Sequence, residues 1–417
     1  MIVHKFGGAS VKDAESIRRV PLLLASIEAE RAFIVISAMG KTTNKLEAIT
    51  NCAFEGKNFV DLFDRLKDEH FCVLRDLMPN DDDATQKLSA LFDESLDVIE
   101  STPRDHYSYF YDQIVSFGER FSSLILEKYL QNSGFDVKLL DASKLFSSDE
   151  NWRAGNINLE ISKANIENAI KDNDNKFLIT QGFIAGTDYG DYLTLGREGS
   201  DYSAGLIAAF SDASDIIFWK DVDGIYSADP KIFKNAVKID RMSYDEMIEL
   251  SYFGAKVLHE KTLFALQDKN IAMQVRSFLD VNKTGTSLYN ISEEKYPPIK
   301  ILSENQILFT CNPRERALIN SNHIKHIYDC ANECNVNISL IQMSALKISF
   351  CAVFDEFACT NMISKLKETF KVKYNIDILL VTLRHYSDKE IAEFESTENI
   401  LLSQISRGTA QYVFKRK

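Results

Sequence analysis

The sequence opens with IVHKFGGASV (residues 2–11), an apolar run that ends in a lysine and two glycines. The run Ile2–Phe6 is short and apolar, as in a buried strand. The two glycines let backbone N–H groups approach an anion, and the helical pattern that follows adds partial positive charge at its N-terminus. Lys5 adds a full charge. The segment predicts a phosphate-binding turn, although many such turns are only structural, and this one is neither a Walker loop nor GxGxxG.

Short apolar runs continue to alternate with longer helical patterns through the first 280 residues. Further buried strands are predicted at Phe33–Ser37, Val137–Asp141, Phe177–Thr180, Ile216–Trp219 and Met273–Ser277. Helices are predicted at Asp13–Ala29, Phe110–Asn132 and Tyr202–Ser211. This alternation indicates an α/β domain with a largely parallel sheet. Residues 55–132 look helical throughout, which makes an insertion large enough to wall one side of a cleft.

The tail has a different pattern, which begins after a linker at Tyr289–Ile299 that contains two adjacent prolines. A strand at Gln306–Cys311, a helix at Ile324–Cys334 and strands at Val336–Ile341 and Lys347–Phe354 follow in order. The order β-α-β-β indicates half of a small ferredoxin-like α+β unit. A second, fainter unit is predicted in Thr360–Lys417.

Composition narrows the class of protein. The 417 residues include 48 Lys and Arg against 61 Asp and Glu, for a net charge of −13, which argues against nucleic acid as a partner. No apolar stretch has membrane-spanning length and the opening residues do not resemble a signal peptide, so a cytoplasmic location without a membrane partner is expected. The 7 cysteines lack CxxC spacing, and we expect Cys330 and Cys334 to pack in a core rather than bind metal.

Four further motifs carry candidate chemistry. In TLGREGSDYSA (194–204), Arg197 offers a planar fork for a carboxylate, and Ser200 and Asp201 stand where a helix cap would lie. WKDVDGIYSADPK (219–231) leaves a buried strand, the usual place for a ligand in an α/β sheet. FGER (117–120) contributes Glu119 and YFGAKVLHEKT (252–262) contributes Lys256. Taken singly, each has a structural alternative: a capped helix, a turn-rich loop, or an exposed charge on a helix.

In conjunction and in order, KFGGAS and these four motifs resemble aspartate kinases of the amino-acid kinase superfamily over roughly residues 1–289. The resemblance implies a mostly parallel sheet sandwiched by helices, followed by ferredoxin-like ACT domains. It implies transfer of the ATP γ-phosphoryl group to the β-carboxylate of L-aspartate, which gives 4-phospho-L-aspartate and is the first step toward lysine, threonine and methionine.

The resemblance also implies a role for each matching residue. Lys5 and Asp201 would be catalytic. The substrate-binding residues would be Ser37, Glu119, Arg197 and Ser200, with Glu119 on the aspartate ammonium and Arg197 on its α-carboxylate. The nucleotide-binding residues would be Lys5, Gly7, Gly8, Ser10, Lys220, Asp221, Tyr226, Lys231 and Lys256. Mg²⁺ would be held mainly by ATP phosphates and water, so no residue is assigned as a metal ligand.

The chain departs from the family pattern at three positions. The family usually has Thr at the position of Ala9, Gly at that of Glu198 and Arg at that of Lys231. The loss of a hydroxyl, the new carboxylate beside Arg197 and the loss of bidentate geometry each bear on efficiency.

The predicted domains are a kinase domain at 1–289 and a regulatory region at 300–417 with two ACT-like units, the second degenerate at Leu401–Phe414. ACT units of this family pair between chains, which implies a homodimer. Lysine or threonine is the implied effector, although Asn312–Asn322 lacks the usual effector-loop glycine. Two alternatives remain open: a sibling acyl kinase for another amino acid, and a catalytically weak amino-acid sensor or partner subunit.

Overall fold

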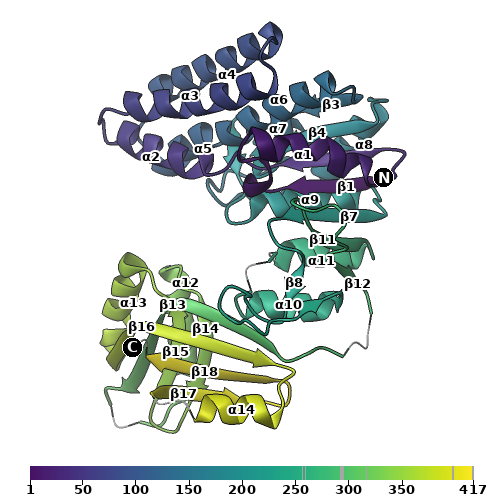
Figure 1. The fold of residues 1–417 in the computed structure, drawn as a ribbon. Helices are drawn as coiled ribbons and strands as arrows, with labels where there is room; N and C mark the ends of the chain where they lie inside the picture. The colour runs from purple at the N-terminus through teal and green to yellow at the C-terminus, as the bar shows by residue number, and fades with distance from the viewer. Residues whose placement is uncertain (256, 259, 292–294, 316, 397–398, 416–417) are drawn as a thin grey trace. The chain divides into compact units, whose positions relative to one another are not determined.

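A computed structural model describes residues 1–255, 257–258, 260–291, 295–315, 317–396 and 399–415 (Figure 1). The chain forms two compact units, and each is described by itself. The first comprises residues 1–225, 238–248 and 257–294, and the second comprises residues 226–237, 249–256 and 295–417. No described helix is long and apolar enough to span a membrane.

The first unit is built on a sheet of eight strands in the order β10-β12-β11-β7-β1-β2-β4-β3. Neighbouring strands are parallel except β11 and β12. The bounds are β1 Ile2–Phe6, β2 Ala32–Ile36, β3 Val137–Leu140, β4 Phe177–Gln181, β7 Asp215–Lys220, β10 Arg241–Ser243, β11 Ala272–Ser277 and β12 Thr286–Tyr289. The strand predicted at the opening of the sequence therefore lies near the middle of the sheet, between β7 and β2.

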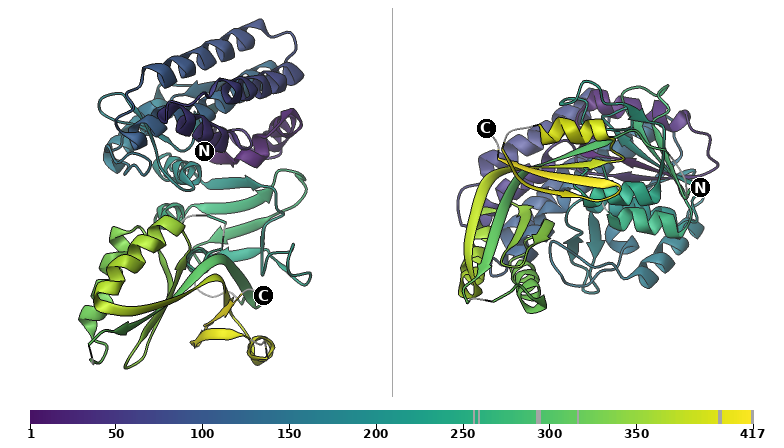
Figure 2. Two further views of the ribbon diagram at one scale, coloured as in Figure 1. Left: turned by 90° about the vertical axis from the view of Figure 1, so that its left-hand side faces the viewer. Right: turned by 90° about the horizontal axis from the view of Figure 1, so that it is seen from below.

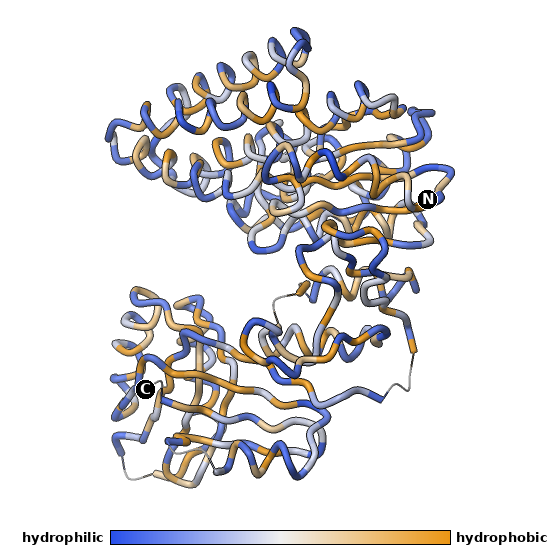
Figure 3. Tube along the Cα trace, viewed as in Figure 1, coloured by the Kyte–Doolittle hydropathy of each residue, from blue (hydrophilic) through white to orange (hydrophobic). Residues whose placement is uncertain are grey.

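The apolar sequence of the central strands explains their position. All five residues of β2 are buried, and the tube of Figure 3 is hydrophobic along most of the central strands but alternates along α3 and α4, which lie on the outside. A strand that is apolar on both faces needs cover on both faces, and helices supply it. The six strands predicted for this region are all present within one residue at each end.

The helices of this unit follow the predicted alternation. They are α1 Ala14–Ala25, α2 Thr42–Phe54, α3 Val60–Leu77, α4 Asp82–Ser101, α5 Tyr107–Val115, α6 Phe117–Asn132, α7 Ala142–Leu145, α8 Leu159–Lys171, α9 Gly199–Phe210, α10 Tyr244–Tyr252 in part, and α11 Glu260–Asp268. The helical insertion is confirmed. The single helix predicted at Phe110–Asn132 is wrong, because the run divides into α5 and α6 at Ser116. The Ser116 hydroxyl donates to the Gln113 carbonyl, a contact that bends helices.

Several short elements connect the larger ones. A 3₁₀ turn, η1, spans Gly8–Val11. A hairpin of β5 Ile184–Gly186 and β6 Tyr192–Thr194 leads into the motif at residues 194–204. Two short strands, β8 Ile225–Tyr226 and β9 Lys238–Ile239, follow β7.

The second unit contains one antiparallel sheet of six strands in the order β14-β15-β13-β16-β18-β17. The bounds are β13 Ile299–Pro313, α12 Ser321–Glu333, β14 Ile338–Met343, β15 Ile348–Val353, α13 Glu356–Thr369, β16 Phe370–Arg384, α14 Asp388–Glu395, β17 Ile400–Ile405 and β18 Thr409–Lys415. The first four strands with α12 and α13 form a complete ferredoxin-like βαββαβ motif. Figure 2 shows both helices on one face of the sheet.

Two long strands join what the sequence suggested as separate repeats. β13 and β16 each have 15 residues and run through both halves of the sheet. The strand predicted at Gln306–Cys311 is therefore only the second half of β13, because a register shift between Ser303 and Gln306 interrupts the apolar pattern. Helix α13 completes the first motif, whereas the sequence predicted a second unit from Thr360 onward. The division at 289 and 300 stays a prediction, and its linker residues 292–294 lie outside the described residues.

Candidate active site

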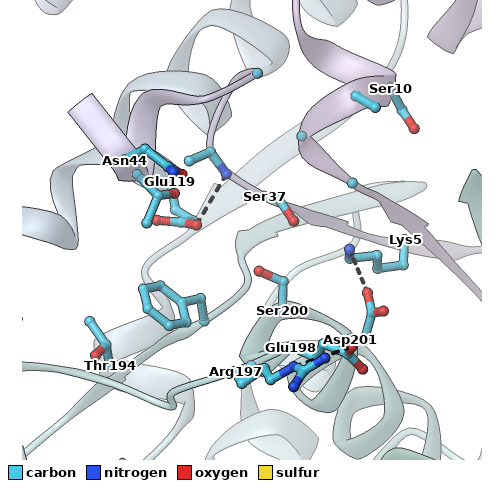
Figure 4. A pocket seen from close by; sticks show the side chains of 18 of the residues that line it. Lys5, Ser10, Ser37, Asn44, Glu119, Thr194, Arg197, Glu198, Ser200 and Asp201 are labelled. Carbon is cyan, nitrogen blue, oxygen red and sulfur yellow. Dashed lines mark hydrogen bonds and ion pairs between the residues drawn. The ribbon is translucent and has the colours of Figure 1, made fainter. Parts of the chain in front are cut away.

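The first unit contains a cavity of about 860 Å³ where the carboxyl ends of β1, β2 and β7 meet (Figure 4). Helix α2, helices α5 and α6, and the N-terminus of α9 supply the remaining walls. In a parallel sheet this edge collects the N-terminal ends of helices and the turns before them, so it is the expected place for an anionic ligand.

The turn after β1 forms one wall and depends on Gly8. The Gly40 N–H donates to the Gly8 carbonyl at 3.0 Å, so the turns after β1 and β2 are joined. A Cβ added to Gly8 would lie 2.8 Å from the Ala38 carbonyl oxygen and 2.9 Å from that of Gly40. Ser10 ties the turn to β7, since its buried hydroxyl donates to the Trp219 carbonyl at 2.9 Å.

Three charged side chains meet at the centre of the cavity. Lys5 Nζ lies 2.5 Å from Asp201 Oδ1, and Lys220 Nζ lies 3.0 Å from Asp201 Oδ2. Lys5 and Asp201 are 5% and 4% exposed. One carboxylate thus fixes two ammonium groups at the ends of adjacent strands β1 and β7, with a net charge of +1 facing the cavity.

The local electrostatics favour an incoming anion. Burial lowers the pKa of the Lys5 ammonium, with Asp201 opposing and Lys220 adding to the shift. Burial alone would raise the pKa of the Asp201 carboxyl, but the two lysines outweigh it and hold that pKa below its usual range. Asp201 is therefore ionised, and a phosphate near Lys5 and Lys220 would relieve the repulsion between them.

Glu119 lies on α6 at the other side of the cavity. Its Oε1 accepts from the Ala38 N–H at 3.1 Å, while its buried Oε2 has no partner among the described atoms. Burial raises the Glu119 pKa to about 8, against the Ala38 hydrogen bond and the positive charge of Lys5. A cationic ligand group would satisfy the free oxygen and favour the ionised form.

The loop before α9 carries Arg197, Glu198 and Ser200. The Arg197 side chain is 76% exposed, and its Nε lies 3.9 Å from Glu198 Oε1, too far for a strong pair. Glu198 is the N-cap of α9 and adopts φ 56°, a conformation that glycine adopts without strain. Ser200 packs so closely on Gly182 that a Cβ there would lie 2.7 Å from the Ser200 Cβ.

Most predicted site residues line this one cavity. They are Lys5, Gly7, Gly8, Ser10, Ser37, Glu119, Arg197, Ser200, Asp201, Lys220 and Asp221. Tyr226 and Lys231 belong to the second unit, and Lys256 lies outside the described residues. The individual roles stay predictions.

The sequence reasoning missed several side chains that also line the cavity: Thr43, Asn44, Glu47, Tyr111, Arg153 and Thr194. The first three lie on α2, directly after the turn that ends β2. No sequence motif marked these positions. Behind this wall, buried Asp112 accepts from the Thr194 hydroxyl at 2.5 Å, and burial raises its pKa to about 6.

Within the described residues, no group of three or more His, Cys, Asp or Glu side chains is arranged to hold a metal ion. Oxygen donors near the cavity are scattered rather than gathered in a cage.

Comparison with known proteins shows which family the chain resembles. The amino acid kinase family model matches residues 1–277. Aspartokinase from Chlamydia pneumoniae is 32% identical over 313 residues, which cover 75% of this chain and 68% of that protein. A chloroplastic bifunctional aspartokinase/homoserine dehydrogenase 2 from Arabidopsis thaliana is 28% identical over 88% of this chain. The chain covers 42% of that relative, less than half its length.

Solved structures agree over nearly the whole chain. E. coli aspartokinase III in complex with aspartate and ADP superimposes with a TM-score of 0.86 at 25% identity, over 99% of this chain and 96% of that one. The same enzyme with lysine and aspartate gives 0.81 at 25% identity, over 100% and 96%. The chain therefore belongs to the amino acid kinase family and, within it, to the aspartokinases.

Proposed function

We propose that this protein is an aspartate kinase, which transfers the γ-phosphoryl group of ATP to the β-carboxylate of L-aspartate and forms 4-phospho-L-aspartate and ADP. The observation that carries the proposal is the pairing, in one cavity, of a lysine pair fixed by Asp201 with the unsatisfied carboxylate oxygen of Glu119. The first suits phosphate and the second suits an ammonium group.

The acceptor needs no general base, because its β-carboxylate is ionised at neutral pH. Catalysis then rests on holding acceptor and phosphoryl donor in line and on neutralising negative charge in the transition state. Lys5 is placed for this, since Asp201 restrains its ammonium group and the glycine turn lines the same cavity. Lys220 would contact the nucleotide phosphates from the adjacent strand.

The acceptor binds, in this proposal, between α6 and the loop before α9. Glu119 takes the α-ammonium with its free oxygen, and Arg197 takes the α-carboxylate once its exposed side chain folds inward. Ser37 and Ser200 line the space between them. Mg²⁺ bound with ATP would neutralise phosphate charge, and phosphates and water would supply most of its ligands.

A coupled assay of ADP formation tests the proposal. The wild-type protein should release ADP only when L-aspartate is present, and hydroxylamine should trap the acyl phosphate as a hydroxamate. Lys5→Met should lower kcat by about 10²-fold or more, the range for removing a preorganised transition-state charge. ATP turnover that does not depend on aspartate would contradict the proposal. Preference for another amino acid in a substrate panel would favour a sibling acyl kinase.

We also propose that the second unit makes the protein a homodimer and binds lysine or threonine. The support is its ferredoxin-like sheet and the likeness to an aspartokinase solved with lysine. Sedimentation of the full chain, and the aspartate-dependent rate measured with each amino acid added, would test both points. A monomer whose rate neither amino acid changes would contradict them. ATP and free aspartate as substrates support a cytoplasmic location, which fractionation of the source cells would test.

A further inference from the structure

Arg153 is a cation in the cavity wall to which the proposed mechanism gives no task. It lies in the loop between α7 and α8, and its backbone is held firmly. The Arg153 N–H donates to Asp112 Oδ2 at 2.7 Å. Asp112 is fully buried, and its other oxygen accepts from Thr194. Two hydrogen bonds to one buried carboxylate therefore fix this point of the loop against α5 and β6.

The same loop supports the segment that carries Arg197. The Gly155 N–H donates to the Thr194 carbonyl at 3.1 Å. Gly196, which adopts φ 74°, lies so close that an added Cβ would be 3.0 Å from the Arg153 carbonyl oxygen. The two arginines are thus carried by backbone segments that touch, and both line the same cavity.

The Arg153 guanidinium lies against aromatic rings, and its positive charge also opposes the burial that raises the pKa of the Asp112 carboxyl. Its Cζ lies 4.3 Å from the ring centroid of Tyr111 and 5.5 Å from that of Tyr107, one helical turn away on α5. Glu47 lines the same wall, but no ion pair or side-chain hydrogen bond of Arg153 is present among the described residues. The planar fork is therefore oriented while its donors stay available to a ligand.

The backbone of Arg153 is in a conformation that an arginine adopts at a cost. Its φ is 69°, in the left-handed region that glycine occupies without strain. Local strain of this kind persists where the side chain serves a purpose that glycine cannot. What glycine could not supply here is a guanidinium that lines the cavity.

We propose that Arg153 binds the α-carboxylate of the acceptor together with Arg197 and so selects acceptors that carry a second carboxylate. This inference rests on the proposed function. It assigns recognition of the non-reacting carboxylate to two guanidinium groups, one held by tyrosine rings and one exposed and free to fold inward.

Arg153→Gly is the sharpest variant, because glycine removes the side chain and suits the backbone angle. The KM for L-aspartate should rise about 10-fold, the low end for a lost charged hydrogen bond at an exposed residue, while the KM for ATP stays unchanged. Arg153→Lys should give an intermediate KM, since it keeps the charge and loses the fork. Arg104→Gly removes an exposed loop arginine that does not line the cavity and should change neither constant.

A competitor that lacks the α-carboxylate separates recognition from structure. 3-Aminopropanoate keeps the amino group and the reacting carboxylate, so its inhibition constant against aspartate should be the same for wild type and Arg153→Gly. The unfolding temperature of the variant should not fall. An unchanged KM for aspartate, or equal weakening of aspartate and 3-aminopropanoate, would overturn this inference alone. Absence of aspartate-dependent turnover in the wild type would overturn the proposed function and the inference with it.

Discussion

At the scale of single residues, the cavity holds charges that the folded chain does not balance. Glu119 is buried with one oxygen unsatisfied, Lys5 and Lys220 share a single carboxylate, and the Arg153 guanidinium forms no ion pair within salt-bridge distance among the described residues. Such arrangements cost stability in the empty protein and are retained where a ligand completes them. The missing partners are an anion near the lysines and a cation near Glu119. The ligands of this cavity should therefore carry both kinds of charge.

Glu119 gives a pH-dependent prediction. Its pKa in the folded protein is about 8, above the ordinary 4.5, so the folded state holds more protons than the unfolded chain between these values. The free energy of unfolding should therefore fall as pH rises through this window. Glu119→Gln should remove that slope and stabilise the empty protein by about 1–3 kcal/mol at pH 8.5, measured by urea unfolding. It should also abolish aspartate binding.

Aspartate binding provides the matching test of the same carboxyl group. If the ligand ammonium draws Glu119 into its ionised form, binding at pH 7 releases a proton, which calorimetry in buffers of different ionisation enthalpy detects. The affinity for aspartate should rise toward pH 8. A flat profile with no proton release would show that Glu119 does not face the ammonium.

Asp201 predicts an effect of the opposite sign. The lysines hold its pKa below the ordinary value, so its contribution to stability is present at neutral pH and is lost as pH falls through and below about 4. Asp201→Asn leaves the Lys5 and Lys220 ammonium groups facing each other without a counter-charge. We expect a loss of about 3 kcal/mol at pH 7 by urea unfolding, and a large fall in kcat. Equal stability of both proteins at pH 7 would contradict the assigned geometry.

At the scale of elements, the turn between β1 and α1 depends on close approach of two backbones. A Cβ on Gly8 would meet two carbonyl oxygens below 3.0 Å, so Gly8→Ala must push the turns after β1 and β2 apart. We expect a loss of about 1–3 kcal/mol in unfolding free energy and weaker ATP binding. Gly408→Ala is the matched control, because nothing lies within 4 Å of a Cβ there. Two variants of equal stability and ATP affinity would refute the close packing.

The limits of a helix or strand were predicted best where the apolar pattern alone marked them. Ile2–Phe6 is a short apolar run, and the structure confirms its limits. The break between α5 and α6 was not predictable, because Ser116 interrupts the helix without a glycine or proline and the apolar pattern continues across it. β13 was predicted too short, since Ser303 to Gln306 is polar and Asn305 adopts φ 55° at the register shift.

The candidate site followed a similar rule. Residues in glycine-rich motifs at strand ends were found, because their spacing reflects the turn that they build. Arg153 and Asn44 were not predicted. Arg153 lies on a loop and Asn44 on a helix, neither of which has a recognisable motif, and both reach the cavity only through tertiary packing. Tyr111 was not predicted for the same reason, because in the sequence it is one more apolar residue of a helix. Only their positions in space distinguish them.

At the scale of the whole molecule, the two units have separate cores. Phe92 stacks on Phe121 in the first, with centroids 3.9 Å apart, and Phe309 stacks on Phe350 in the second, at 4.7 Å. The described residues that line the candidate active site all belong to the first unit. We therefore expect each unit to unfold in its own thermal transition, with ligands of the active site affecting only that of the first unit.

Calorimetry of the full chain tests this division. Phe92→Ala and Phe309→Ala each remove a fully buried ring and should cost about 3–5 kcal/mol, each lowering one transition and leaving the other in place. ADP with aspartate should raise the transition that Phe92→Ala lowers, because ligands stabilise the unit that binds them. The reverse pattern would place the binding site in the second unit. A single transition lowered equally by both substitutions would mean that the chain unfolds as one cooperative body, and that any effector bound to the second unit acts on the stability of the whole.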